Sequence, residues 1–328
     1  MADRCRICEN ADDNKTHSAR EMMFGTRERF EYLECARCGT LQLVDVPGLS
    51  AHYPDNYYAH DEAPVIDIER GWKRRVAARA IGRYMLGLPS RLGERLARRR
   101  PWIAEQFPHY LRGLAGRVNF DSRVLDYGCG RGDLLRTMQV FGFRDLTGAD
   151  KFIDGDLRYG GVKIVKGGLD TLGGEYDLAM LHHSFEHLPD PHATLARLRE
   201  ILSPDGLLLV RIPVVSFAWE KYGVDWVQLD PPRHLFLYTE RSFRDLAEKA
   251  GFAIERVVYD SEIFQFFGSE QYARDIPLND PRSYRGVISE SIFTQEQIDE
   301  WESMASKLNA AGRGDQACFF LTPQVSCR

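Results

Sequence analysis

Short apolar runs alternate with stretches of helical periodicity from residue 123 onward. Seven of these runs have the length and composition of strands, at 123–127, 145–149, 162–165, 176–181, 207–212, 253–259 and 317–322. Helical patterns lie between them at 132–141, 191–202 and 239–250. Strands that alternate with helices predict a parallel α/β sheet of seven strands.

A separate helical pattern at 72–88 is amphipathic and basic. Its apolar stripe comprises Val76, Ala77, Ala80, Ile81, Tyr84, Met85 and Leu88. The opposite side carries Arg74, Arg75, Arg79 and Arg83. We favour a helix that packs on the main domain and exposes its basic face, because amphipathicity is normal for surface helices. The other interpretation is that it docks to an anionic membrane surface or an acidic partner.

Three parts follow from these patterns: residues 1–50, a connector with basic amphipathic helices at 51–118, and the α/β domain at 119–328. The α/β domain carries an insertion at about 265–313. The segment 52–68, which contains Pro and Tyr residues, is predicted to be a linker. With 328 residues, 44% hydrophobic and 28% charged, the chain is long and apolar enough to fold, which excludes a wholly disordered protein.

Neither a membrane span nor a signal peptide is expected. No run approaches the roughly 18 apolar residues of a span, and the first residues lack an apolar segment. We therefore expect a cytoplasmic protein, with peripheral contact at the inner face of the membrane through 70–100 as an option. That segment holds eleven Lys and Arg and the single acid Glu94, so its charge of +10 within a net −5 leaves −15 elsewhere.

Four of the seven cysteines form two C-x2-C pairs, Cys5/Cys8 and Cys35/Cys38, while the others are Cys129, Cys318 and Cys327. Two such pairs can supply four thiolates to one tetrahedral Zn²⁺. The spacing predicts a structural zinc ribbon, because four protein ligands leave no open position for catalysis. The alternative is four unrelated buried cysteines.

The first predicted strand of the α/β domain ends in a glycine-rich turn, Asp126-Tyr-Gly128-Cys-Gly130-Arg-Gly132, which opens a helix. Glycines allow a ligand to approach the backbone, and free N–H groups at a helix start favour electronegative atoms. Asp150 closes the next strand, where a carboxylate can accept hydrogen bonds from ribose hydroxyls. The pair indicates an adenosine ligand.

Residues 123–259 resemble the cofactor half of class I S-adenosylmethionine-dependent methyltransferases, which have a Rossmann-like sheet. The resemblance rests on the glycine turn, on Asp150 and on the stretch Glu186-His187-Leu-Pro-Asp-Pro191, which is similar to a motif of bacterial sugar, glycan and secondary-metabolite methyltransferases. It implies S-adenosylmethionine as cofactor. The implied cofactor contacts are Asp126, Gly128, Gly130, Gly132, Asp150, Phe152, Leu169, Asp170 and His182.

The candidate catalytic residues are His183, His187, His234 and Glu186. Methyl transfer needs alignment of the acceptor, and a hydroxyl or carbon acid also needs a base, for which histidine is suited. Glu186 could orient an imidazole. The candidate acceptor contacts are Trp226, Arg233 and Tyr272; for Arg233, a grip on phosphate or carboxylate and a loop-fixing ion pair are equally open.

We predict methyl transfer to a sugar, nucleotide-sugar or glycan acceptor. Similar zinc-bearing sugar C-methyltransferases carry a further C-terminal domain, for which this chain is too short, so O-methylation is favoured and C-methylation stays open. An RNA methyltransferase that docks through the ribbon and the basic segment is an alternative, disfavoured by the acidic body. The other alternative is a non-catalytic S-adenosylmethionine-binding protein.

Overall fold

The protein is described by a computed structural model that covers residues 4–52, 71–284 and 286–324. Nearly all of the predicted linker 52–68 lies outside the described residues, and so does Cys327. Within the described part, no helix is both long enough and apolar enough to cross a bilayer.

The described residues of the main domain form an eight-stranded sheet in the order β11-β12-β9-β8-β4-β5-β7-β6. The strands are β4 (Arg123–Tyr127), β5 (Asp145–Asp150), β6 (Leu157–Tyr159), β7 (Val162–Lys166), β8 (Tyr176–His182), β9 (Leu202–Pro213), β11 (Phe252–Tyr259) and β12 (Gln316–Pro323). Strands β7, β5, β4, β8 and β9 run parallel, whereas β12 is antiparallel to both of its neighbours. The predicted α/β Rossmann-like class is confirmed.

Two details of the sheet differ from the prediction. Strand β6, which pairs antiparallel with β7, was not predicted because three residues around an exposed Arg158 give no readable alternation. Strand β9 begins at Leu202, five residues before the predicted start, since the polar sequence Ser-Pro-Asp-Gly that follows Leu202 gives no strand signal.

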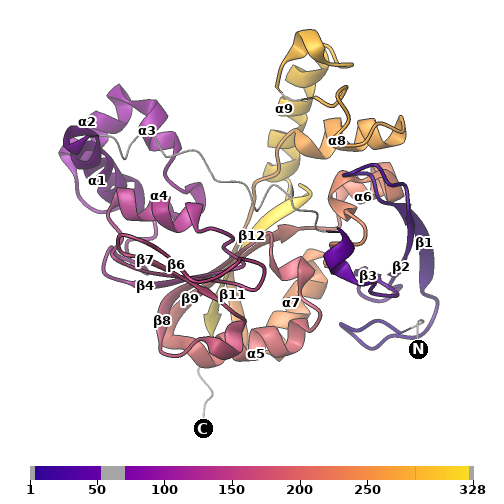
Figure 1. Ribbon diagram of the computed structural model, residues 1–328, viewed down its shortest axis with the longest axis horizontal. Helices are drawn as coiled ribbons and strands as arrows, with labels where there is room; N and C mark the ends of the chain where they lie inside the picture. The colour runs from indigo at the N-terminus through magenta and orange to yellow at the C-terminus, as the bar shows by residue number, and fades with distance from the viewer. Residues whose placement is uncertain (1–3, 53–70, 285, 325–328) are drawn as a thin grey trace.

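Helices cover both faces of this sheet, as Figure 1 shows. One face carries α4 (Asp133–Phe141) and the hairpin-like group α1 (Trp72–Leu86), α2 (Arg91–Arg99) and α3 (Pro101–Glu105). The other face carries α5 (Pro191–Ile201) and α7 (Glu240–Lys249). Alternate strand residues serve the two cores: Val124 and Leu178 pack with the α4 side, and Leu125 and Ala179 with the α5 side.

The buried face of α1 differs from the predicted stripe. Ala77, Ala78, Ile81 and Leu86 are buried, whereas Val76 and Tyr84 are exposed. The cause is Gly82, where a Cβ would lie 2.6 Å from the carbonyl oxygen of Phe141. The backbones of α1 and α4 therefore approach each other closely at this glycine. This contact rotates the helix and turns Val76 outward.

The N-terminal residues form a second, four-stranded sheet in the order β1-β2-β3-β10. Strands β1 (Lys15–Arg20), β2 (Arg29–Glu34) and β3 (Leu41–Leu43) come from the first fifty residues. The fourth, β10 (Phe236–Leu237), comes from the main domain and pairs antiparallel with β3. This sheet therefore extends beyond residues 1–50 and ties them to the 230s.

Residues 260–315 connect β11 to β12 and include the predicted insertion. They form α8 (Phe264–Ala273), a 3-10 turn η9 (Ile288–Glu290) and α9 (Gln295–Ala310). Phe266, Phe293 and Trp301 form a small core between these helices. The remaining short helices are η1 (Leu49–His52), η4 (His109–Leu111), η5 (Leu169–Thr171), η6 (Phe185–His187), α6 (Phe217–Tyr222), η7 (Gly223–Asp225) and η8 (Val227–Leu229).

Candidate active site

The glycine turn lies between the end of β4 and the start of α4. Gly128 and Gly132 have φ angles of 79° and 83°, in the left-handed region that favours glycine. A Cβ on Gly128 would meet the Cβ of Ser184, and one on Gly132 would meet Ile164 Cδ1 at 2.3 Å. Both the conformation and the space at this turn therefore require glycine.

Asp150 holds the turn against the end of β5. Its Oδ2 accepts a hydrogen bond from the backbone N–H of Gly130 at 2.9 Å, and its Oδ1 accepts one from the N–H of Phe152 at 2.8 Å. The ring of Phe152 is 64% exposed, whereas Leu169 in η5 is buried and the neighbouring Asp170 is exposed. The predicted cofactor residues thus gather at the carboxyl ends of β4, β5 and β7, where open α/β sheets bind ligands.

His182 ends β8 and is the last of the predicted cofactor contacts. Its ring packs against the ring of Tyr110 of η4 in a tilted arrangement, with centroids 4.4 Å apart. Neither ring nitrogen has a hydrogen-bond partner within the described part of the chain. Burial lowers the pKa of His182 well below its ordinary value, so the ring is neutral.

His183 follows with a φ of 47°, which is uncommon for a residue with a side chain. Its Nε2 lies 2.9 Å from Arg211 Nη1, and Arg211 Nε donates to Asp260 Oδ2 at 2.7 Å. A guanidinium can only donate, so Nε2 of His183 is the accepting nitrogen and Nδ1 carries the proton. Nδ1 faces Glu186 Oε1 at 3.5 Å.

Glu186 is fully buried beside the histidines. Burial opposes its ionisation, but the N–H of His183 and the neighbouring His187 and His234 outweigh that effect and hold its pKa at about 2. His187 and His234 each direct Nδ1 at a backbone carbonyl, of Arg233 at 2.8 Å and of Gln228 at 2.7 Å.

The four predicted catalytic residues form one cluster. Because carbonyls only accept hydrogen bonds, the protons of His187 and His234 sit on Nδ1. Burial lowers the pKa of His234 to about 4, and its Nε2 lies 3.9 Å from Glu186 Oε1. Glu186, His187 and His234 have side-chain donor atoms within 4.8 Å of one another.

The predicted acceptor contacts need correction, because all three side chains are buried. Trp226 donates its Nε1–H to Asp315 at 3.0 Å, and Tyr272 is buried in a hydrophobic cluster that also contains residues of the N-terminal sheet. Arg233 is 0% exposed and donates to Glu21 Oε1 at 2.9 Å and to Asp230 Oδ2 at 2.9 Å. The loop-fixing ion pair is therefore the role that the structure gives to Arg233.

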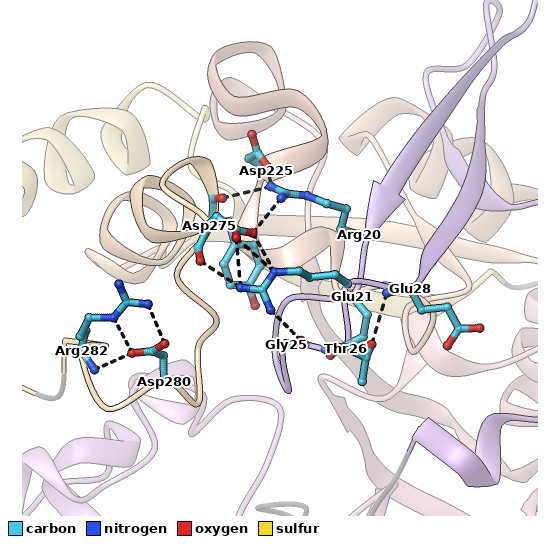
Figure 2. Close-up of polar contacts among 11 residues, drawn as sticks. Arg20, Glu21, Gly25, Thr26, Glu28, Asp225, Asp275, Asp280 and Arg282 are labelled. Carbon is cyan, nitrogen blue, oxygen red and sulfur yellow. Dashed lines mark hydrogen bonds and ion pairs between the residues drawn. The ribbon is translucent and has the colours of Figure 1, made fainter.

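Further ion pairs join β1 to the segment after α8. Figure 2 shows Arg20 between Asp225 and Asp275, with N–O distances of 3.0 and 2.9 Å. Arg27 also pairs with Asp275 at 3.0 Å. The N-terminal sheet, the 225–234 loop and the residues after α8 are thus held together by charged contacts.

A pocket of about 340 Å³ adjoins the histidine cluster through Arg211. Its walls are Arg211, Gln228, Glu262, Phe264, Gln265, Asp315 and Gln316. Within the described residues, the buried Oε1 of Gln265 has no hydrogen-bond partner. A larger hollow of about 640 Å³ lies along β11 between α7 and the end of α9, and it includes none of the predicted site residues.

Sequence reasoning missed Tyr110, Arg211 and Asp260. The sequence does contain a sign of Arg211, because this charged residue interrupts an apolar strand near the carboxyl end of the strand. Asp260 directly follows an apolar run in the same way, at the end of β11. Tyr110 lies outside the α/β repeat, and no local pattern places it against His182.

The cysteine pairs also meet in space. Cys5 Sγ lies 3.7 Å from Cys38 Sγ, and Cys8 Sγ lies 3.5 Å from Cys35 Sγ. All four sulfur atoms lie within 4.8 Å of one another. Four thiolates bound to Zn²⁺ at about 2.3 Å are separated by roughly 3.8 Å, so this donor set fits a tetrahedral ion.

Comparison with known proteins decides the family. A family described as a methyltransferase domain matches residues 79–257, more than half of the chain. The chain belongs to this family. A ubiquinone biosynthesis O-methyltransferase from Cereibacter sphaeroides is 30% identical over 172 residues, which are 46% of this chain and 68% of that protein.

Solved structures of low sequence identity are also similar to the methyltransferase. A putative sarcosine dimethylglycine methyltransferase from Galdieria sulphuraria has 15% identity and a TM-score of 0.41, over 79% of this chain and 100% of that one. A cyclopropane synthase from Mycobacterium tuberculosis has 20% identity and a TM-score of 0.39, over 63% and 80%. The methyltransferase family uses S-adenosylmethionine, so the predicted enzyme class is confirmed.

Asp126 is expected to make the binding of S-adenosylmethionine depend on pH. Burial, and secondly the charge of Asp150, raise its pKa to about 7. If Asp126 faces the cationic amino group of the methionine part, the Kd for S-adenosylmethionine should fall several-fold between about pH 6 and about pH 7.5, as the carboxyl ionises. Asp126→Asn should give a flat profile in isothermal titration calorimetry.

The same shift affects stability in the opposite sense. Between about pH 4 and about pH 7 the native state retains a proton that the unfolded state has released. The Asp126 contribution therefore lowers the free energy of unfolding as pH rises through this window, and Asp126→Asn should remove this contribution.

For the binding prediction, a wild-type Kd for S-adenosylmethionine that stays constant between about pH 6 and about pH 7.5 would place the amino group of the cofactor elsewhere.

Proposed function

We propose that the enzyme methylates a hydroxyl of a sugar or of a sugar-bearing small molecule. The observation that carries this proposal is the pocket lined by Arg211, whose guanidinium contacts His183. Its amide and carboxylate groups supply both donors and acceptors, as a polyhydroxylated ligand needs, and Phe264 offers an apolar face. The unpartnered Oε1 of Gln265 would receive an acceptor hydroxyl. The O-methyltransferase name of the relative supports oxygen over carbon.

S-adenosylmethionine, when bound, supplies an electrophilic methyl group. The residues that would hold it are the glycine turn, Asp126 and Asp150, with Phe152 and Leu169 beside the adenine and Asp170 within reach of its amine. The pocket would align the acceptor oxygen for in-line attack, and the buried surroundings of His182 would exclude water.

We assign the role of base to His183. Its Nε2 carries the lone pair, which in the structure accepts a hydrogen bond from Arg211 Nη1 at 2.9 Å, so the acceptor hydroxyl would take the place of that donor. Its Nδ1–H points to Glu186, whose buried negative charge would stabilise the imidazolium that forms when the acceptor proton is taken. His187 and His234 would hold the 230s loop in place through the bonds from Nδ1–H to the carbonyls of Arg233 and Gln228.

His183→Asn tests this assignment, since asparagine tolerates a positive φ. We expect kcat to fall by about 10² to 10⁴, with an unchanged Kd for S-adenosylmethionine. His187→Asn, the matched control in the same cluster, should lose much less. Equal losses in the two variants would mean that the cluster is structural, and full activity of His183→Asn would place the base elsewhere.

The four-cysteine cluster is proposed to hold one structural Zn²⁺. The spacing of its sulfur atoms and the burial of Cys5, Cys35 and Cys38 support this role. With four protein ligands the ion would have no open position, so it would organise the N-terminal sheet and take no part in methyl transfer.

The acceptor class can be tested with methyl-labelled S-adenosylmethionine. The protein is incubated with host lysate separated into nucleotide-sugar, lipid-linked glycan and RNA fractions, with His183→Asn as the control for enzymatic transfer. We expect label in one of the two sugar pools. Label in RNA alone would overturn the proposal and favour an RNA methyltransferase.

A further inference from the structure

The outer surface of α1, α2 and α3 exposes apolar side chains among arginines. Of the ten large hydrophobic side chains that are exposed in the described residues, five lie between positions 72 and 102: Trp72, Val76, Tyr84, Leu92 and Trp102. Trp72 is 70% exposed and Leu92 is 56% exposed. Residues 71–100 also carry ten Lys and Arg against the single acid Glu94.

On α1, the apolar and basic side chains share one face. Trp72, Val76, Arg79 and Arg83 follow the 4-3-4 spacing of a helical stripe, on the side opposite Ala78 and Ile81, which pack on the core. The exposed face of the helix is therefore not purely basic, because it carries apolar and basic side chains together. Its outward face is mixed.

The same arrangement recurs on α2. Gly93 is buried against the carbonyl of Ala80, which turns Leu92, Arg95 and Arg99 outward. Glu94, the one acid, is paired with Arg98 at 2.6 Å. Trp102 at the start of α3 lies near Arg74, whose guanidinium is 6.0 Å from its ring centroid.

We propose that this face, formed by the outward side chains of α1, α2 and the start of α3, binds an anionic phospholipid surface. Arginines attract anionic headgroups, and the transfer of tryptophan and leucine side chains from water to the boundary of the acyl chains is favourable. The aliphatic Val76 and Leu92 distinguish a lipid from a nucleic acid, because they would gain little against phosphates or bases.

The face is connected to the active site through a short path. Residues 106–108 lead from α3 to η4, where Tyr110 packs against His182 and His109 Nε2 lies 2.7 Å from Asp260 Oδ2. In Figure 1, α1, α2 and α3 lie on the opposite side of the molecule from the N-terminal sheet. Docking through this face would leave that sheet free and would bring the site close to a membrane-borne acceptor.

The full chain is tested by co-sedimentation with phosphatidylcholine vesicles, with and without about 30% phosphatidylglycerol. We expect binding to the anionic vesicles only. The double variant Arg79→Glu/Arg83→Glu should weaken it at least about tenfold. The matched control Arg158→Glu/Arg241→Glu makes the same charge change at exposed positions on β6 and α7, and should bind like the wild type.

A second double variant separates insertion from attraction. Trp72→Ser/Leu92→Ser keeps every charge and should also weaken binding to anionic vesicles by at least about tenfold, while methyl transfer to a water-soluble acceptor stays unchanged in all these variants. Failure of the sugar assay leaves this binding test intact, because vesicle binding needs no acceptor. Absent vesicle binding, equal losses in the Arg158/Arg241 control, or binding to RNA but not to vesicles would overturn the proposal.

Discussion

Asp150→Ala is expected to raise the Kd for S-adenosylmethionine by about 100-fold or more. A carboxylate that accepts two ribose hydroxyls contributes about 1.5–3 kcal/mol per hydrogen bond, and every 1.4 kcal/mol is a factor of ten in affinity. The structure adds a second cause. Asp150 also accepts hydrogen bonds from the backbone N–H groups of Gly130 and Phe152, so its removal should loosen the turn that is predicted to hold the cofactor.

The control for this variant lies on the same strand. Asp145→Ala removes an exposed carboxylate from the other end of β5, where its pairing with Arg123 at 3.6 Å is weak. Its Kd should equal that of the wild type, as measured by isothermal titration calorimetry. Asp150→Asn retains one acceptor and should fall between the two. If Asp150→Ala binds with unchanged affinity and keeps its melting temperature, the ribose must bind elsewhere.

The sheet and the glycine turn could be read from the sequence because their signals are local. Each apolar run is continuous, the glycines of the turn are close together in the sequence, and Asp126 and Asp150 each lie at the end of such a run. The orientation of α1 could not be read in this way, since it depends on Gly82 meeting a carbonyl of α4, which is distant in the chain.

The role of Arg233 shows the same limit more sharply. For an arginine after two prolines, the neighbouring residues alone leave a ligand contact and a loop-fixing ion pair equally open. Its partner Glu21 lies 212 positions away in the sequence, and only the folded chain brings the two together. The pairing of β10 with β3 is equally non-local. The sequence therefore predicted residues 1–50 and the α/β domain as separate parts, whereas in the structure they share a sheet.

This shared sheet makes Cys35→Ser the most informative change in the N-terminal part. Loss of one thiolate should release the proposed zinc and unfold residues 1–45, which hydrogen exchange would report as lost protection. The unfolding would reach the active site. Tyr32 donates its hydroxyl to the carbonyl of His234 at 2.7 Å, and the N–H of Leu43 donates to the carbonyl of Leu235 at 2.9 Å.

Glu21 would leave Arg233 at the same time. Removing one partner from a buried ion pair costs about 3–5 kcal/mol, so the loop that carries His234 should lose its fixed position beside Glu186. We therefore expect kcat to fall by at least about 100-fold, while the Kd for S-adenosylmethionine stays close to that of the wild type, because the glycine turn has no contact with this sheet among the described hydrogen bonds.

The control is Ala36→Ser, which introduces the same side chain at an exposed position inside the same C-x2-C turn. It should retain one equivalent of zinc by elemental analysis, the full melting enthalpy and the wild-type kcat. A Cys35→Ser protein that kept its melting enthalpy would contradict a structural metal site. One that lost residues 1–45 but retained kcat would show that the His234 loop holds its position without Glu21 and Tyr32, and the N-terminal sheet would then stabilise the fold without positioning the site.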